Sequence, residues 1–87
     1  MSAKWQNQQC RVPTSDNWYP TASDGCVLAS CVILANGQFR TCVWGEDNYG
    51  LELDVDCAEV AQHWYERIKA TDCITIERLK QWGFTVA

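Results

Sequence analysis

Six cysteines and one histidine are the residues of this sequence with the widest chemical range. A structural zinc site needs four Cys or His ligands, usually in closely spaced pairs, and no CxxC pair occurs here. Cys57 and His63 lie on roughly opposite sides of the helix expected there. A thiolate at Cys57 would be opposed by the neighbouring carboxylates of Asp54, Asp56 and Glu59. We therefore predict no metal site, no cofactor and no catalytic nucleophile, and we expect a protein that is not an enzyme.

The cysteines also bear on the cellular compartment. The first nine residues contain no apolar stretch of the kind that forms a secretory signal. Five of the six cysteines lie in or beside apolar stretches, where a free thiol behaves as a small hydrophobic side chain. We expect reduced, buried thiols and a cytoplasmic protein, with a disulfide framework as the alternative. No apolar run reaches the ~18 residues of a membrane-spanning helix, so we expect no membrane partner.

Charge is the second signal in this sequence. The 87 residues carry 11 carboxylates and 7 Lys or Arg side chains, for a formal net charge of −4. Seven of the carboxylates fall within residues 41–66, which contain no Lys or Arg. Proteins that stack aromatic side chains on nucleic acid combine them with a basic groove, and no such groove is indicated here, which disfavours direct nucleic-acid binding. The acidic segment is either a solvated strand edge or an electronegative face for a basic protein surface.

The clearest structural signal is a β-hairpin between residues 26 and 44. Two β-rich runs flank Asn36-Gly37, a pair that suits a two-residue type I′ turn because both residues tolerate positive φ. With this turn, the numbers of opposed residues sum to 73, so that Cys31 faces Cys42. The first run is apolar on both sides, which is typical of strands that are covered on both faces.

We expect helices to cover one face of this first strand and a second layer to cover the other. The N-terminal segment is the first candidate for the second layer, through Trp5, Trp18 or Tyr19. A partner protein or a second copy of the chain is the other candidate.

Residues 50–56 alternate between apolar and acidic side chains, which predicts a half-buried strand with one solvated face. The apolar side of this strand must match the apolar side of the preceding strand. That match predicts a register in which Arg40 faces Asp54 and Phe39 faces Val55.

The period changes from that of a strand to that of a helix at Asp56. Asp56 and Glu59 have the spacing of an N-cap and its capping-box partner. A second, shorter helix is predicted from near Thr75 to Gly83, a residue type that suits the left-handed position after a helix.

Together these elements predict one α+β domain over residues 1–87. We expect an antiparallel sheet of three to four strands, a β-meander, with two C-terminal helices packed on one face. Residues 1–25 are expected to be irregular, with a possible edge strand from Trp5 to Val12. Residues 26–56 are expected to form the meander and residues 57–84 the two helices.

The acidic strand and the aromatic residues beside it are the strongest functional candidate, since such groupings are typical of interaction hot spots. We predict a small acidic binding protein of the phage or mobile-element type. As an inhibitor or adaptor in the host cytosol, it would dock on a basic, nucleic-acid-handling protein. The alternative is a structural or assembly subunit, such as a homodimer, that self-associates through the apolar sheet face. The predicted partner-binding residues are Trp44, Glu46, Asp47, Tyr49, Glu52 and Asp54.

Overall fold

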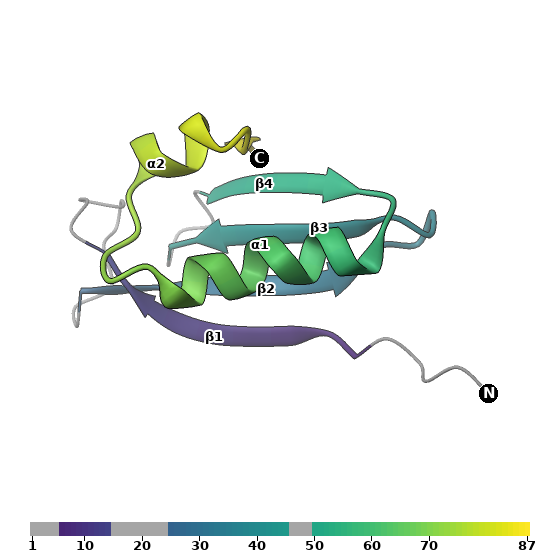
Figure 1. Ribbon diagram of the computed structural model, residues 1–87, viewed down its shortest axis with the longest axis horizontal. Coiled ribbons are helices and arrows are strands. Elements are labelled where there is room, and N and C mark those ends of the chain that lie inside the picture. The colour runs from purple at the N-terminus through teal and green to yellow at the C-terminus, as the bar shows by residue number, and fades with distance from the viewer. Residues whose placement is uncertain (1–5, 15–24, 46–49) are drawn as a thin grey trace.

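The computed structural model describes residues 6–14, 25–45 and 50–87 of the chain. Its strands form one antiparallel sheet in the order β1-β2-β3-β4-β5, and two helices lie between β4 and β5 in the sequence (Figure 1). The fold is therefore α+β. The elements are β1 (Gln8–Pro13), β2 (Cys26–Ile33), β3 (Phe39–Trp44), β4 (Gly50–Val55), α1 (Ala58–Ala70), α2 (Ile76–Gln81) and β5 (Thr85–Val86).

The sheet has five strands, where the sequence predicted three to four. The additional strand is β5, which pairs with β4 at Leu51↔Val86 and Glu52↔Thr85. Gly83 has a φ of 101°, a left-handed conformation that turns the chain after α2 back toward β4. A strand of two residues is too short to show an alternating pattern, which is why the sequence did not reveal it.

Helix α1 lies across one face of the sheet (Figure 1). The odd-numbered residues of β2 and β3 point toward it, because successive strand residues alternate between faces. The Thr41 hydroxyl donates a hydrogen bond of 2.8 Å to the Ala61 carbonyl and so links the sheet to the helix. The buried hydrophobic core comprises Val12, Val27, Ala29, Cys31, Val43, Leu51, Ala61, Tyr65, Ile68, Ile74, Leu79 and Phe84.

The register of the β2–β3 hairpin differs by one residue from the prediction. The Leu34 amide donates to the Gln38 carbonyl at 2.7 Å, and the Gly37 amide donates to the Leu34 carbonyl at 3.0 Å. These bonds enclose a three-residue loop in which Gly37 has a φ of 88°, the arrangement of a type I turn followed by a left-handed residue. The predicted two-residue turn is therefore wrong, and Cys31 faces Thr41 rather than Cys42.

The predicted register between β3 and β4 is confirmed. Phe39 pairs with Val55, and Arg40 pairs with Asp54. The alternation of apolar and acidic residues in β4 was sufficient to predict this register, because shifting the strand by one residue would place its acidic side chains in the core.

The second helix begins as its sequence predicted, and the first does not. The Thr75 hydroxyl caps α2 by accepting a hydrogen bond of 3.1 Å from the Arg78 amide. Helix α1 has Cys57 rather than Asp56 at its N-cap, and no side chain caps it. The predicted capping pair is therefore wrong, although Glu59 lies in the first turn, where a carboxylate interacts favourably with the helix dipole.

The cysteines are free thiols that are divided between core and surface. Cys31 is buried, and this burial raises the pKa of its thiol. Cys57 and Cys73 are exposed, so the expectation of buried thiols is wrong for these two. Among the helices that the structure describes, none combines the length and the apolar character needed to cross a membrane.

Candidate functional site

The sheet face turned away from α1 is the candidate site, and no described helix or strand packs on it. We call it the open face. It is formed by the even-numbered residues of β2, β3 and β4, because in both registers each even-numbered residue pairs with an even-numbered residue of the neighbouring strand. Trp5, Trp18 and Tyr19, the first candidates to cover the second face of the sheet, lie outside the described residues. The open face comprises Leu28, Ser30, Val32, Arg40, Cys42, Trp44, Glu52 and Asp54.

Arg40 lies between two carboxylates on the open face. Its Nε and Nη2 atoms donate to the two Asp54 oxygens at 2.7 and 3.0 Å, and Nη2 lies 3.1 Å from Glu52 Oε2. One guanidinium reaches both because Asp54 is directly opposite in the register and Glu52 is the diagonal neighbour. The open face therefore holds a carboxylate–guanidinium–carboxylate cluster with one excess negative charge.

This cluster perturbs the ionisation of its members. The hydrogen bonds from Arg40 hold the pKa of the Asp54 carboxyl below its usual range. In turn, the hydrogen bond with Asp54 raises the pKa of Arg40. Each side chain is about one-quarter to one-third exposed, so solvent screens the pairs and each contributes roughly 0–1 kcal/mol. The main effect of the cluster is thus to orient the Glu52 and Asp54 carboxylates, and its contribution to the free energy of unfolding is small.

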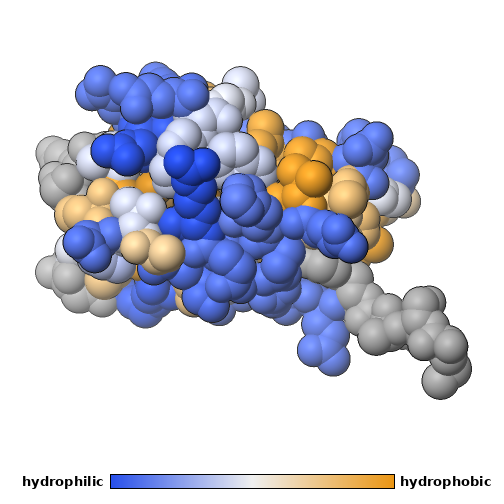
Figure 2. Space-filling model, in the orientation of Figure 1, coloured by the Kyte–Doolittle hydropathy of each residue, from blue (hydrophilic) through white to orange (hydrophobic). Residues whose placement is uncertain are grey.

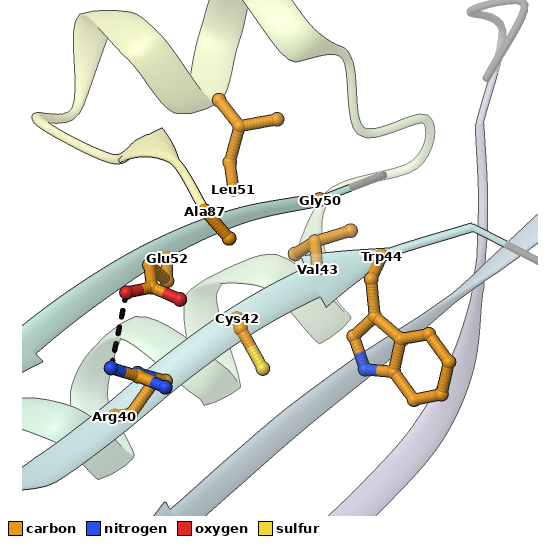
Figure 3. A pocket seen from close by; sticks show the side chains of 8 residues that line it. All are labelled: Arg40, Cys42, Val43, Trp44, Gly50, Leu51, Glu52 and Ala87. Atoms are coloured by element: carbon orange, nitrogen blue, oxygen red, sulfur yellow. Dashed lines mark ion pairs between the residues drawn. The ribbon is translucent and has the colours of Figure 1, made fainter. Parts of the chain in front are cut away.

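Beside the cluster the open face is hollowed by about 210 Å³ (Figure 3). Arg40 and Glu52 form one side, Trp44 lies at the other, and the Cys42 thiol lies between them. The Trp44 indole N–H donates to the Ser30 hydroxyl at 3.4 Å, which orients the ring across β2. An aromatic ring and a charged cluster therefore border the same small hollow.

Gly50 allows the strands beside this hollow to approach closely. A Cβ atom at this position would lie 2.6 Å from Trp44 Cβ and 2.7 Å from the Val43 carbonyl oxygen. Both distances are below van der Waals contact, so a side chain at Gly50 would displace Trp44. Glycine here is a packing requirement of the β3–β4 pair, next to the predicted site.

The thiol that lines the hollow is not activated as a nucleophile. Burial raises the pKa of the Cys42 thiol to about 11, so it is protonated at neutral pH and a poor nucleophile. Within residues 6–14, 25–45 and 50–87, no group of three or more His, Cys, Asp or Glu side chains is placed to hold a metal ion. His63 is exposed on α1, where its ring packs edge-on against Trp64.

The structure brings three of the six predicted site residues together. Trp44 and Glu52 border the same hollow, and Asp54 shares the Arg40 guanidinium with Glu52. The other three predicted residues lie outside the described part of the chain; they are Glu46, Asp47 and Tyr49.

Sequence reasoning missed the apolar part of the open face. The predicted two-residue turn, with opposed residues that sum to 73, would place Leu28 and Val32 on the side of Val43. The observed register, shifted by one residue, places them on the side of Trp44. Alternation offered no signal against this error, because β2 is apolar on both sides.

The chain matches no protein-family model, and it matches no curated protein and no solved structure. The residues and their geometry are therefore the basis for a functional assignment.

Proposed function

We propose that this protein is a nonenzymatic binding protein whose open face docks on a basic surface of a protein partner. The observation that carries the proposal is the placement of Trp44, Glu52 and Asp54 on one sheet face that no described element covers. In this proposal both helices pack on the opposite face and serve as the scaffold.

The carboxylates of the open face are suited to receive a cation. Each carboxylate has about four acceptor positions, and Arg40 uses only some of them. A Lys or Arg side chain of the partner can therefore bind the remaining lone pairs without displacing Arg40. Because Arg40 already orients both carboxylates, less side-chain freedom is lost when the partner binds.

Trp44 supplies the apolar part of such an interface. Tryptophan is among the residue types most enriched at interaction hot spots, where an apolar anchor is surrounded by a polar rim. The overall charge of −4 adds attraction toward a basic partner and raises the association rate. A nucleic-acid-handling protein is the proposed partner, since its surface is basic, and an inhibitor or adaptor of phage type acting in the cytosol is the proposed role.

The test compares two double charge reversals in affinity capture from cells of the source organism, with quantitative mass spectrometry. Glu52→Lys with Asp54→Lys alters the open face, whereas Asp72→Lys with Glu77→Lys makes the same charge change at exposed positions after α1 and in α2. We expect the wild type and the Asp72→Lys, Glu77→Lys variant to capture the same partners. The Glu52→Lys, Asp54→Lys variant should capture about tenfold less of these partners, because like charges at an interface repel.

Folding should be nearly unaffected by either variant. Exposed charge substitutions usually cost within about 0.5 kcal/mol, and the loss of the Arg40 pairs adds up to about 1 kcal/mol. If the folded open-face variant retains the same proteins as the wild type, the carboxylates are only a solvated strand surface.

Self-association is the second candidate function. It is favoured by two apolar side chains of β2 on the open face: Leu28, which pairs with Trp44, and Val32, which pairs with Arg40. Sedimentation velocity at low and high salt separates the two candidates. A dimer held by apolar contacts persists at high ionic strength, whereas a complex held by charge weakens.

A further inference from the structure

A second surface feature lies on the helix layer, away from the open face. The Arg67 guanidinium carbon lies 4.6 Å from the centroid of the Trp82 ring and 5.5 Å from that of Trp64. The two indole rings are themselves in contact, with centroids 5.6 Å apart, and Phe84 packs edge-on against Trp64 at 5.9 Å. We call Arg67 with these three aromatic residues the arginine platform.

The platform joins elements that are separate in the sequence. Trp64 and Arg67 lie one turn apart on α1, and Trp82 is the C-cap residue of α2. Phe84 is buried and anchors the rings in the core. The aromatic rings that contact the guanidinium are therefore held in place by buried Phe84, while the Arg67 side chain itself is exposed. Figure 2 shows the helix-side surface, which is largely hydrophilic over α1.

None of the described residues around Arg67 neutralises its charge. The nearest carboxylate in the sequence, Glu66, accepts a hydrogen bond of 2.6 Å from Gln62 and lies 3.6 Å from Lys69. The guanidinium makes no hydrogen bond and no ion pair to any residue that the structure describes. Stacking uses the flat face of a guanidinium and leaves the N–H groups at its edge available.

We propose that the arginine platform is a docking point for an Asp or Glu side chain of a protein partner. A guanidinium recognises a planar carboxylate through two parallel N–H···O bonds, and the stacking holds Arg67 in one plane before the ligand arrives. Arginine and tryptophan are also the residue types that most often dominate interface energetics. The surface is thus suited to a carboxylate that lies across the outer edge of the platform.

A protein carboxylate fits this surface better than a nucleic-acid backbone does. Binding to nucleic acid requires several phosphate contacts along a basic track. Here the next cation on α1, Lys69, is engaged by Glu66, and the chain as a whole carries a charge of −4. The indole faces are also occupied by Arg67 and by each other, so they are not free to stack on bases.

This inference stands independently of the open face. It gives the protein a second contact surface of opposite charge preference on its other layer. If both surfaces function, the protein is an adaptor that holds a basic and an acidic surface on opposite sides of its sheet.

The test is an NMR titration of the full chain with an acetylated, amidated hexaglutamate peptide, which follows the Arg67 Nε–H and the Trp64 and Trp82 indole N–H signals. The variants are Arg67→Gln and Arg67→Lys, and the matched control is Arg78→Gln, an identical charge change at an exposed position of α2. We expect saturable shifts in the wild type and in the control. The peptide should bind at least tenfold more weakly to Arg67→Gln. It should bind several-fold more weakly to Arg67→Lys, which keeps the positive charge but lacks the two parallel N–H donors of a guanidinium.

Three outcomes would overturn the proposal. They are the absence of a saturable shift in the wild type at millimolar peptide, equal weakening in Arg67→Gln and Arg78→Gln, and tighter binding of oligo(dT) than of the peptide at the same signals. The amide spectrum of each variant verifies its fold, and the wild-type titration decides the proposal by itself if Arg67→Gln does not fold. Because none of these measurements involves Glu52 or Asp54, failure here leaves the open-face proposal intact.

Discussion

Arg40 and Arg67 represent the two layers of this molecule, and their surroundings differ. Arg40 lies on the open face between Glu52 and Asp54, which engage its Nε and Nη2 donors. Arg67 lies on the helix layer against Trp64 and Trp82, and its guanidinium makes no hydrogen bond or ion pair to a described residue. The charge that a side chain offers to a partner therefore depends on its neighbours more than on its exposure. The open face offers carboxylates oriented by an arginine, and the helix layer offers an arginine oriented by aromatic rings.

The two faces of the sheet also differ in burial, and this difference should give the largest change in stability. Ile68 of α1 is fully buried against the sheet, so Ile68→Ala should lower the free energy of unfolding by about 2–5 kcal/mol through lost packing and a cavity. Val32 on the open face is only half-buried, and Val32→Ala should cost less than about 1 kcal/mol. Urea denaturation of the two variants measures both values. Equal costs would show that something covers the open face as fully as α1 covers the other.

The Arg40 cluster should contribute a smaller and pH-dependent amount. At pH 7, Arg40→Gln should lower the free energy of unfolding by up to about 1 kcal/mol, since the pairs are partly screened. The folded-state pKa of Asp54 is depressed, so this stabilisation is present above the unfolded pKa of about 4 and is lost as the pH falls through the folded value. The difference between wild type and variant in urea denaturation should therefore shrink below pH 4. A difference that stays constant down to pH 2 would contradict the pairing with Asp54.

The arginine platform should contribute a similarly small amount to stability, without the pH dependence of the Arg40 cluster. Arg67→Gln removes an exposed cation–π contact, which is worth about 0.5–1 kcal/mol. No described carboxylate pairs with Arg67, so this loss should be the same at pH 7 and below pH 4, in contrast to Arg40→Gln. Denaturation at the two pH values tests this expectation. A loss that disappears in acid would mean that a carboxylate of the chain pairs with Arg67, and the contrast between the two arginines would fail.

Much of the fold was accessible from the sequence, and the exceptions have physical causes. The alternation of residues 50–56 predicted β4 and its pairing with β3, because one face is acidic and a shifted register would bury charge. The β2–β3 hairpin was located correctly but shifted by one residue. Gly37 takes positive φ in a two-residue turn and in the three-residue loop that forms, so its presence does not distinguish them. With β2 apolar on both sides, no burial pattern corrected the shift.

The two candidate sites differed in how far the sequence predicted them. Glu52 and Asp54 were identified because they are close in the sequence and lie on one strand face. The arginine platform was not, since Trp64 and Trp82 each fit the apolar stripe of a helix when taken alone. Their contact depends on the way α2 returns beside α1, which is a long-range property of the fold.

Strand β5 has a consequence for aggregation. Its two residues are exposed and add little to the core. They nevertheless cover the first half of the outer edge of β4, together with the Ala87 amide, which donates to the Gly50 carbonyl at 2.9 Å. Without them, β4 would present the free backbone groups of a strand that carries Leu51, Leu53 and Val55 on one side. Uncovered strands of this kind are templates for pairing between chains. Strand β5 and Ala87 thus protect this part of the sheet edge against intermolecular strand addition.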